Sequence, residues 1–368
     1  QMPTPMSQSS QVFNFSAGPA ILPASVLEIV QQDLLNLADS GMSILEMSHR
    51  SRTVDQLLHE VEADVRALAD IPENYSVLFL QGGASLQFSM LPMNLLSVEQ
   101  PADYLVTGVW SQKAVQEAEK VGAVRIAGST ESEGFIRIPR QDELSCSPNA
   151  AYAHFTSNNT IYGTQWQDAP DVGTVPLVSD MSSDIFSRPL NIERYGFVYA
   201  SAQKNLGPAG LTLVIIRNDL LERSSRSLPS VMNYATLVKH GSRYNTPPVF
   251  GIYVLHLVVK WLRERGGLAG IARGNERKAA KVYAEIDRTE FYQGVATDDS
   301  RSFMNITFKL PTKSLDEVFT QEATKVGLLG IAGHRLLEGQ RASLYNAMPE
   351  SGAVALASFM RDFERRHG

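Results

Sequence analysis

Two polar residues follow successive apolar runs of the chain. Asp180 comes directly after the run 175–179, and Lys204 follows the run 197–200, just before a small-residue turn at 206–210. Ligands of open α/β sheets bind at the carboxyl ends of the strands, so we expect both side chains at one site. A buried carboxylate needs a partner, and a desolvated lysine has a lowered pKa and forms imines with aldehydes. A cofactor with a protonated pyridine nitrogen and an aldehyde, pyridoxal phosphate (PLP), would satisfy both residues.

Each residue also has an ordinary structural interpretation. Asp180 could cap the following turn, where Ser182 and Ser183 stand close by. Lys204 could be a solvated surface residue, as most lysines are. Neither residue is specific alone, and only the pair favours the cofactor.

A glycine-rich turn and a tryptophan are further candidates. The segment 82–85 (Gly-Gly-Ala-Ser) follows a strand-like run and opens a helix, where backbone N–H groups and the helix dipole favour a phosphate. Such turns are common, but this one lacks the spacing of the dinucleotide and P-loop motifs. Trp110 could offer a flat face to the pyridine ring, although a tryptophan is more often core.

A group of cations could bind an anionic substrate. His49 and Arg50 lie in one small-residue context, and His334, Arg335 and Arg341 lie in another. Arginine forks bind carboxylate and phosphate bidentately, so a substrate carrying both groups would suit them. The alternative is solvated loop residues, since spacing cannot show that the five converge.

Other chemistries find little support. The single cysteine, Cys146, excludes an intrachain disulfide, and the chain lacks the HExxH and GxSxG motifs, so we expect no metal site and no serine hydrolase. The net charge of −6 argues against nucleic acid or anionic lipid as a partner. The most apolar stretch, 252–262, is too short to span a bilayer and predicts a buried helix. One cysteine also fits a cytoplasmic location.

Short apolar runs and helical stretches must position these residues. Strands are expected at 76–80, 103–107, 151–156, 175–179, 197–200 and 211–216. Helices are expected at 25–37, 54–68 and 113–121. Runs without alternation fit a sheet covered on both faces, so the pattern predicts an α/β fold with a mainly parallel central sheet flanked by helices.

After residue 266 the pattern of predicted helices and strands changes and indicates a smaller α+β domain. Helices are expected at 268–288, 315–326 and 353–366, and strands at 304–310 and 343–346. With 368 residues, two domains are the default. We assign residues 25–265 to a large cofactor-binding domain, 11–24 with 266–368 to a small domain, and 1–10 to a disordered tail.

In addition to these residue-level features, the sequence resembles the phosphoserine aminotransferase family of fold-type I PLP enzymes almost from end to end. The matching motifs, in chain order, are FNFSAGP, EMSHRS, FLQGGASLQF, TSNNTIYGTQ, DMSSDIFSRP, AQKNLGPAG, YNTPP and RASLYNAMP. The resemblance implies that PLP is bound by Ala84, Ser85, Trp110, Thr160, Asp180, Gln203, Lys204, Asn245 and Thr246.

The resemblance also implies roles. Lys204 would hold PLP as a Schiff base and shuttle the proton between substrate Cα and cofactor C4′, Asp180 would pair with the pyridine nitrogen, and Trp110 would stack on the ring. Ala84, Ser85 and Gln203 would bind the phosphate, and Thr160 would lie near the phenolic oxygen. Asn245 and Thr246 would reach that phosphate from the other subunit of a homodimer. Arg341 would hold the substrate carboxylate, and His49, Arg50, His334 and Arg335 would meet the substrate phosphate or the glutamate side chain.

The implied reaction exchanges an amino group between phosphoserine and 2-oxoglutarate, giving 3-phosphohydroxypyruvate and glutamate, in serine biosynthesis and, in some bacteria, vitamin B6 biosynthesis. A related enzyme acting on an unphosphorylated amino acid, or a non-enzymatic protein that retains the fold, are the alternatives. Two positions depart from the family: Ser85 stands where some members have arginine, and Leu336-Leu337-Glu338 replaces small residues. These departures predict that phosphate recognition depends on the remaining cations.

Overall fold

The computed structural model describes residues 12–224 and 227–368. The predicted disordered tail, 1–10, lies outside these residues. A large seven-stranded sheet has the strand order β2-β10-β9-β8-β5-β3-β4. Its strands are β2 (Tyr75–Leu80), β3 (Ala102–Val106), β4 (Val124–Ser129), β5 (Ala153–Thr156), β8 (Leu177–Asp180), β9 (Phe197–Ser201) and β10 (Thr212–Arg217). The neighbours from β9 to β4 are parallel, and β10 runs antiparallel to both β9 and β2.

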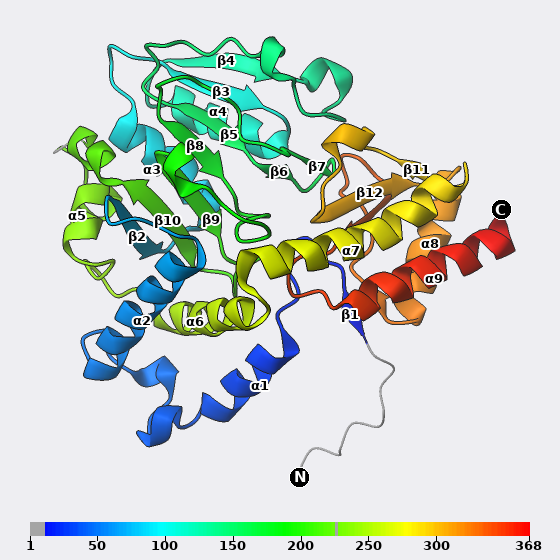
Figure 1. The fold of residues 1–368 in the computed structure, drawn as a ribbon, viewed down its shortest axis with the longest axis horizontal. Helices are drawn as coiled ribbons and strands as arrows, with labels where there is room; N and C mark the ends of the chain where they lie inside the picture. Colours follow the sequence, from blue (N-terminus) through cyan, green and yellow to red (C-terminus); the bar gives the residue numbers. More distant parts are fainter. Residues whose placement is uncertain (1–11, 225–226) are drawn as a thin grey trace.

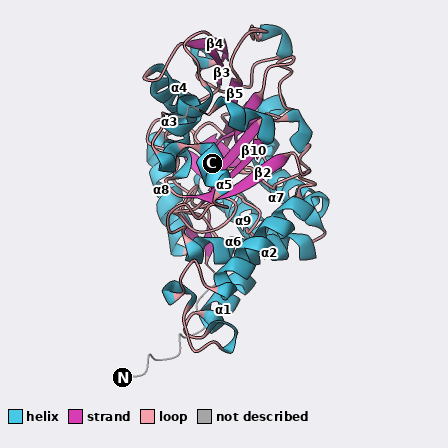
Figure 2. Ribbon diagram, turned by 90° about the vertical axis from the view of Figure 1, so that its left-hand side faces the viewer, coloured by secondary structure: helices cyan, strands magenta, loops and turns pink. Residues whose placement is uncertain are grey.

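Helices cover both faces of this sheet, as Figures 1 and 2 show. They are α1 (Ala24–Asp33), α2 (Arg52–Leu68), α3 (Gly83–Leu95), α4 (Val109–Glu119), α5 (Tyr234–Lys239) and α6 (Val249–Glu264). Alternate residues of β2 enter different cores: Val77 packs with α2 and α6, whereas Leu78 packs with α3, α4 and α5. This two-sided burial explains why the strands read as continuous apolar runs. The predicted fold class is confirmed.

The amphipathic helix α2 shows how local sequence sets this packing. Ser51 caps it, since its side chain accepts a hydrogen bond from the Val54 amide. Its buried residues recur at intervals of three or four: Val54, Leu58, Val61, Val65 and Leu68. Each apolar side chain buried in this way contributes about 1.5–3 kcal/mol of transfer free energy.

The remaining elements build a second, smaller core. A three-stranded sheet, β11-β12-β14, comprises β11 (Gln293–Gly294), β12 (Asn305–Lys309) and β14 (Gln340–Ser343). Around it lie α7 (Gly267–Arg288), α8 (Lys313–Lys325) and α9 (Glu350–His367), and β1 (Phe13–Asn14) pairs with β13 (Leu328–Leu329). Phe13 and Phe15 share one hydrophobic cluster with these helices and strands. This cluster supports the proposed small domain of 11–24 with 266–368, although Leu268 and Ile271 of α7 pack with the large core.

Several element boundaries were predicted wrongly. The helix expected at 25–37 ends at Asp33, and the strand expected at 343–346 lies instead at Gln340–Ser343, where it pairs with β12. Strand β4 and the short hairpin of β6 (Asn158–Asn159) and β7 (Thr164–Gln165) were missed. Strand β10 is antiparallel because only ten residues join it to β9, fewer than a parallel crossover needs.

Candidate active site

A cavity of about 350 Å³ opens at the carboxyl ends of β5, β8 and β9. Asp180 ends β8, Thr156 ends β5, and Lys204 lies in the turn after β9. Three segments complete its wall: the first turn of α3, Trp110 in the first turn of α4, and the turn residues Ala209 and Gly210. The volume lies in the range of small-molecule sites.

Lys204 and Asp180 determine the electrostatics of this cavity. Burial lowers the pKa of Lys204, and the nearby Asp180 carboxylate partly opposes that shift. Burial raises the pKa of Asp180, and Lys204 and hydrogen bonds from Ser182 oppose it. Among the residues described, no hydrogen bond or ion pair within 4.0 Å engages Lys204 Nζ. Lys204 is therefore poised as a nucleophilic amine.

The two oxygens of Asp180 differ in their partners. Oδ1 accepts hydrogen bonds from the Ser182 amide (2.9 Å) and from Ser182 Oγ (2.7 Å). Within the described chain, Oδ2 accepts none, and Thr156 Oγ1, also in the cavity wall, is buried without a partner. A carboxylate held by one oxygen with the other free suits a cationic ring N–H. These residues fit PLP on the evidence of their own unsatisfied groups.

Two glycines with positive φ line the cavity at the start of α3. Gly82 has a φ of +90°, and a Cβ there would lie 2.7 Å from the Leu86 Cβ. At Gly83 (φ +66°) a Cβ would approach Ser201 Oγ to 3.1 Å. Ala84, Ser85 and Gln203 line the same cavity, and Ser201 Oγ donates to Gln203 Oε1 at 2.7 Å. A helix N-terminus with bare backbone fits the predicted phosphate site.

Trp110 and Arg341 are joined through Thr160. Trp110 Nε1 donates to Thr160 Oγ1 (3.2 Å), and Arg341 Nη1 donates to the Thr160 carbonyl (3.2 Å). Lys204 Nζ lies 5.1 Å from the centroid of the Trp110 ring. Arg341 Nε is buried without a partner, and burial lowers the pKa of this guanidinium. Arg341 therefore retains donors for an anion close to the cavity.

The structure brings some predicted substrate residues together and leaves others apart. Burial, and then the charges of Arg341, Arg335 and Lys113, lower the pKa of His334, which is next to Arg335 in the chain. The cavity lining of the single chain lacks eight predicted residues: His49, Arg50, Thr160, Asn245, Thr246, His334, Arg335 and Arg341. The Thr246 carbonyl accepts a hydrogen bond from Gln81 Nε2 (2.8 Å), next to the glycine turn. The roles of all predicted site residues remain proposals.

Sequence reasoning missed several residues of the wall. Thr156, Ser182, Ser183 and Ser201 line the cavity, and a Cβ on Gly18 would lie only 3.1 Å from Lys204 Cγ. Their place directly after or near strand ends was a usable signal. Among the described residues, no group of three or more His, Cys, Asp or Glu side chains is arranged to hold a metal ion. No helix there has the length and apolar composition to cross a bilayer.

The parallel sheet, the cavity at its carboxyl edge and the Lys204–Asp180 pair define a PLP-dependent enzyme. The sequence profile of the family described as Aminotransferase class-V matches residues 12–356. A phosphoserine aminotransferase of Herpetosiphon aurantiacus is 53% identical over 97% of this chain and 99% of its own, and one of Lysinibacillus sphaericus is 51% identical over 98% and 99%.

Solved structures agree with these relatives. The phosphoserine aminotransferase of Bacillus circulans subsp. alkalophilus superimposes with a TM-score of 0.96 at 47% identity, over 98% of this chain and all of the other. The PLP-bound enzyme of Trichomonas vaginalis gives 0.91 at 38% identity, over 95% of this chain and all of the other. The chain therefore belongs to the class-V aminotransferases and, within them, to the phosphoserine aminotransferase family. Its cofactor is pyridoxal phosphate.

Proposed function

We propose that this chain exchanges an amino group between phosphoserine and 2-oxoglutarate, yielding 3-phosphohydroxypyruvate and glutamate, in serine biosynthesis. The observation behind this proposal is that a desolvated lysine and a half-paired buried aspartate lie near Arg341, which has no carboxylate partner among the described residues. The names of the near full-length relatives supply the substrate.

Bound PLP would serve as the electron sink for the bond broken at substrate Cα. Lys204 would hold the cofactor, and its amine, once free, would move a proton at the substrate Cα. Burial lowers the pKa of this amine, which favours the neutral form that can accept a proton. Asp180 Oδ2 would pair with a protonated ring nitrogen, while Ser182 holds the carboxylate through Oδ1.

The basic side chains near the cavity would orient the substrate through its anionic groups. Arg341, held at the Thr160 carbonyl, would bind the α-carboxylate through its remaining donors. His334 and Arg335 would meet the phosphate or the glutamate side chain from the neighbouring loop. Trp110, fixed by its hydrogen bond to Thr160, would cover one face of the ring.

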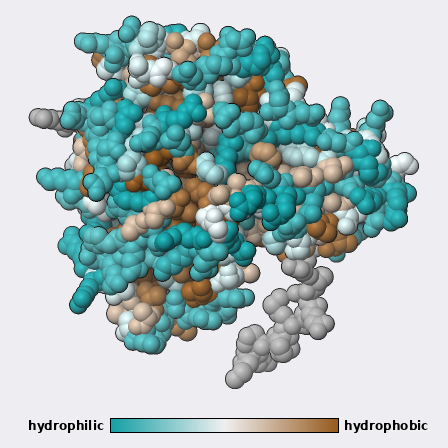
Figure 3. Space-filling view, viewed as in Figure 1, coloured by the Kyte–Doolittle hydropathy of each residue, from teal (hydrophilic) through white to brown (hydrophobic). Residues whose placement is uncertain are grey.

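We also propose a homodimer whose partner supplies His49, Arg50, Asn245 and Thr246. In support, Arg50, Asn245 and Thr246 are exposed in the single chain. The segment around α1 also exposes large apolar side chains: Leu27, Ile29, Leu35, Met42 and Leu45. In Figure 3, where hydrophilic residues dominate the surface, brown patches lie over this lower region as well as over the centre of the face. Sedimentation of the holoenzyme tests the dimer.

An assay with two amino donors tests the proposed reaction. The purified protein should be yellow with PLP, lose that colour on borohydride reduction, and convert phosphoserine with 2-oxoglutarate far faster than serine. Equal turnover of serine would instead favour the related activity on unphosphorylated amino acids. A protein that cannot be loaded with PLP would contradict both. A cytoplasmic location and use of vitamin B6 pathway substrates stay predictions.

A further inference from the structure

Two ammonium groups lie against the ring of Trp110. Lys204 Nζ is 5.1 Å from its centroid, and Lys113 Nζ is 4.8 Å from it. Lys113 lies one turn after Trp110 in α4 and is exposed, whereas Trp110 and Lys204 line the cavity. The tryptophan therefore holds Lys113 at the edge of the site.

Lys113 is linked to the predicted substrate cations through Trp110. Trp110 Nε1 donates to Thr160 Oγ1, and Arg341 Nη1 in β14 donates to the Thr160 carbonyl. Burial first, and then nearby charges that include that of Lys113, lower the pKa of His334 in the loop before β14. Helix α4, this loop and β14 therefore contribute basic side chains to one group.

This group lacks its counter-charge. In the part of the chain that the structure describes, Lys113, Arg335 and Arg341 have no carboxylate within 4.0 Å. Lys120, on the same helix, is by contrast bound to Glu117 at 2.7 Å. Like charges that converge without a carboxylate repel one another, and a bound anion relieves that repulsion.

We propose that Lys113 binds the phosphate of the phosphorylated substrate and favours dianionic over monoanionic side chains. The inference rests on the proposed function and adds a residue to its specificity. A phosphate monoester carries a charge of about −1.5 to −2 near pH 7, against −1 for the side-chain carboxylate of glutamate. Because Coulomb energy scales with charge, the fold-change for phosphoserine should be roughly the square of that for glutamate.

The test compares Lys113→Gln with Lys113→Arg and the matched control Lys120→Gln as PLP holoenzymes. Half-reaction kinetics are measured with phosphoserine and with glutamate. In Lys113→Gln, kcat/KM should fall about 10-fold for phosphoserine and about 3-fold for glutamate. Lys113→Arg should keep the ratio of the two substrates, and Lys120→Gln should match the wild type. Adding 0.5 M salt, roughly, should shrink the difference between wild type and Lys113→Gln.

Two results would overturn the inference. Equal losses for both substrates, or a weakened affinity for PLP with unchanged substrate selectivity, would mean that Lys113 only steadies Trp110. The proposed function fails separately, and this inference with it, when the wild type does not turn over phosphoserine. When the wild type does so and Lys113→Gln keeps the wild-type ratio, only the role of Lys113 is lost.

Discussion

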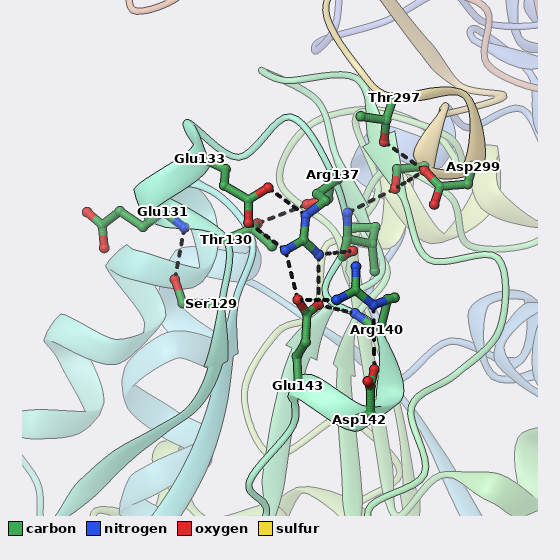
Figure 4. A network of polar contacts seen from close by, with 12 residues as sticks. Ser129, Thr130, Glu131, Glu133, Arg137, Arg140, Asp142, Glu143, Thr297 and Asp299 are labelled. Carbon is green, nitrogen blue, oxygen red and sulfur yellow. Dashed lines mark hydrogen bonds and ion pairs between the residues drawn. The ribbon is translucent and has the colours of Figure 1, made fainter.

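Two arginine sites of this molecule differ in where their counter-charges come from. Arg137 forms ion pairs with Glu133 and Glu143, and Glu143 also contacts Arg140 at 3.0 Å (Figure 4). Arg341, at the cavity, donates only to the Thr160 carbonyl and leaves Nε without a partner among the described residues. The chain itself completes the first site, where the ion pairs anchor a surface loop. The second site is left for a ligand to complete.

The same contrast applies to the lysines. Lys120 is paired with Glu117 on the surface of α4, whereas Lys204 is desolvated and has no such pair within residues 12–224 and 227–368. Burying a cation without a close carboxylate costs free energy of folding. The folded protein tolerates this destabilisation at Lys204, where a reactive amine is needed. Substitutions at the cavity should therefore affect mainly activity, and substitutions at the paired surface residues should affect mainly stability.

The largest effect is expected for Lys204→Ala. Loss of the amine that holds the cofactor and moves the Cα proton should lower kcat for phosphoserine at least about 10³-fold. The Tm of the apoprotein should not fall, because the substitution removes a desolvated cation whose burial destabilises the fold. Lys120→Ala is the control and should retain wild-type turnover. Near-normal activity of Lys204→Ala would remove Lys204 from the mechanism.

Asp180→Asn should have the next largest effect. The amide keeps the shape but cannot support a protonated ring nitrogen, and breaking a buried ion pair costs about 3–5 kcal/mol. We expect kcat to fall about 10²–10³-fold and PLP to dissociate more readily, measured by absorbance titration. Ser182→Ala should reproduce a smaller part of this loss, because Ser182 only holds Oδ1. An unchanged PLP affinity and rate would contradict the pairing.

Arg341→Gln should impair substrate binding and spare stability, whereas Arg137→Gln should do the reverse. The first should raise KM at least about 10-fold for phosphoserine and for glutamate alike, as both carry the α-carboxylate, with little change in Tm. The second should lower Tm by a few degrees and leave KM unchanged. A Tm loss in the first without a change in KM would show that Arg341 is structural.

The smallest effect is expected for Glu143→Gln, and it should depend on pH. Hydrogen bonds from Arg137 lower the pKa of Glu143 to about 2. Because the pKa of Glu143 is lower in the folded than in the unfolded state, its ionised carboxylate stabilises the folded state at pH values above about 4.5. This contribution is lost as the pH falls from about 4.5 to about 2. Since Glu143 is exposed, the Tm difference from wild type should be at most about 2 °C at pH 7 and should vanish only below about pH 2. A Tm difference between wild type and Glu143→Gln that grows as the pH falls would contradict this prediction.

The elements that carry the chemistry could be predicted from the sequence more readily than the small domain. Asp180 and Lys204 follow apolar runs, and such runs mark buried strands whose ends face one edge of the sheet. The position of β14 could not be predicted, because its limits depend on pairing with β12 across more than thirty residues of chain. The direction of the antiparallel strand β10 was not predicted, although the short turn after Lys204 contained the signal.

The sequence by itself determined the Lys204–Asp180 pair and the glycine turn, and with its motifs the PLP family. These features depend on residue types at fixed spacing along adjacent strands, which local physics places together. Only the tertiary structure decided that Arg341 reaches Thr160, that Trp110 binds the same residue, and that Lys204 lies against the Trp110 ring. Those contacts join segments as much as 181 residues apart. Their meeting depends on how the small core packs against the sheet, and no local spacing in the chain encodes that packing.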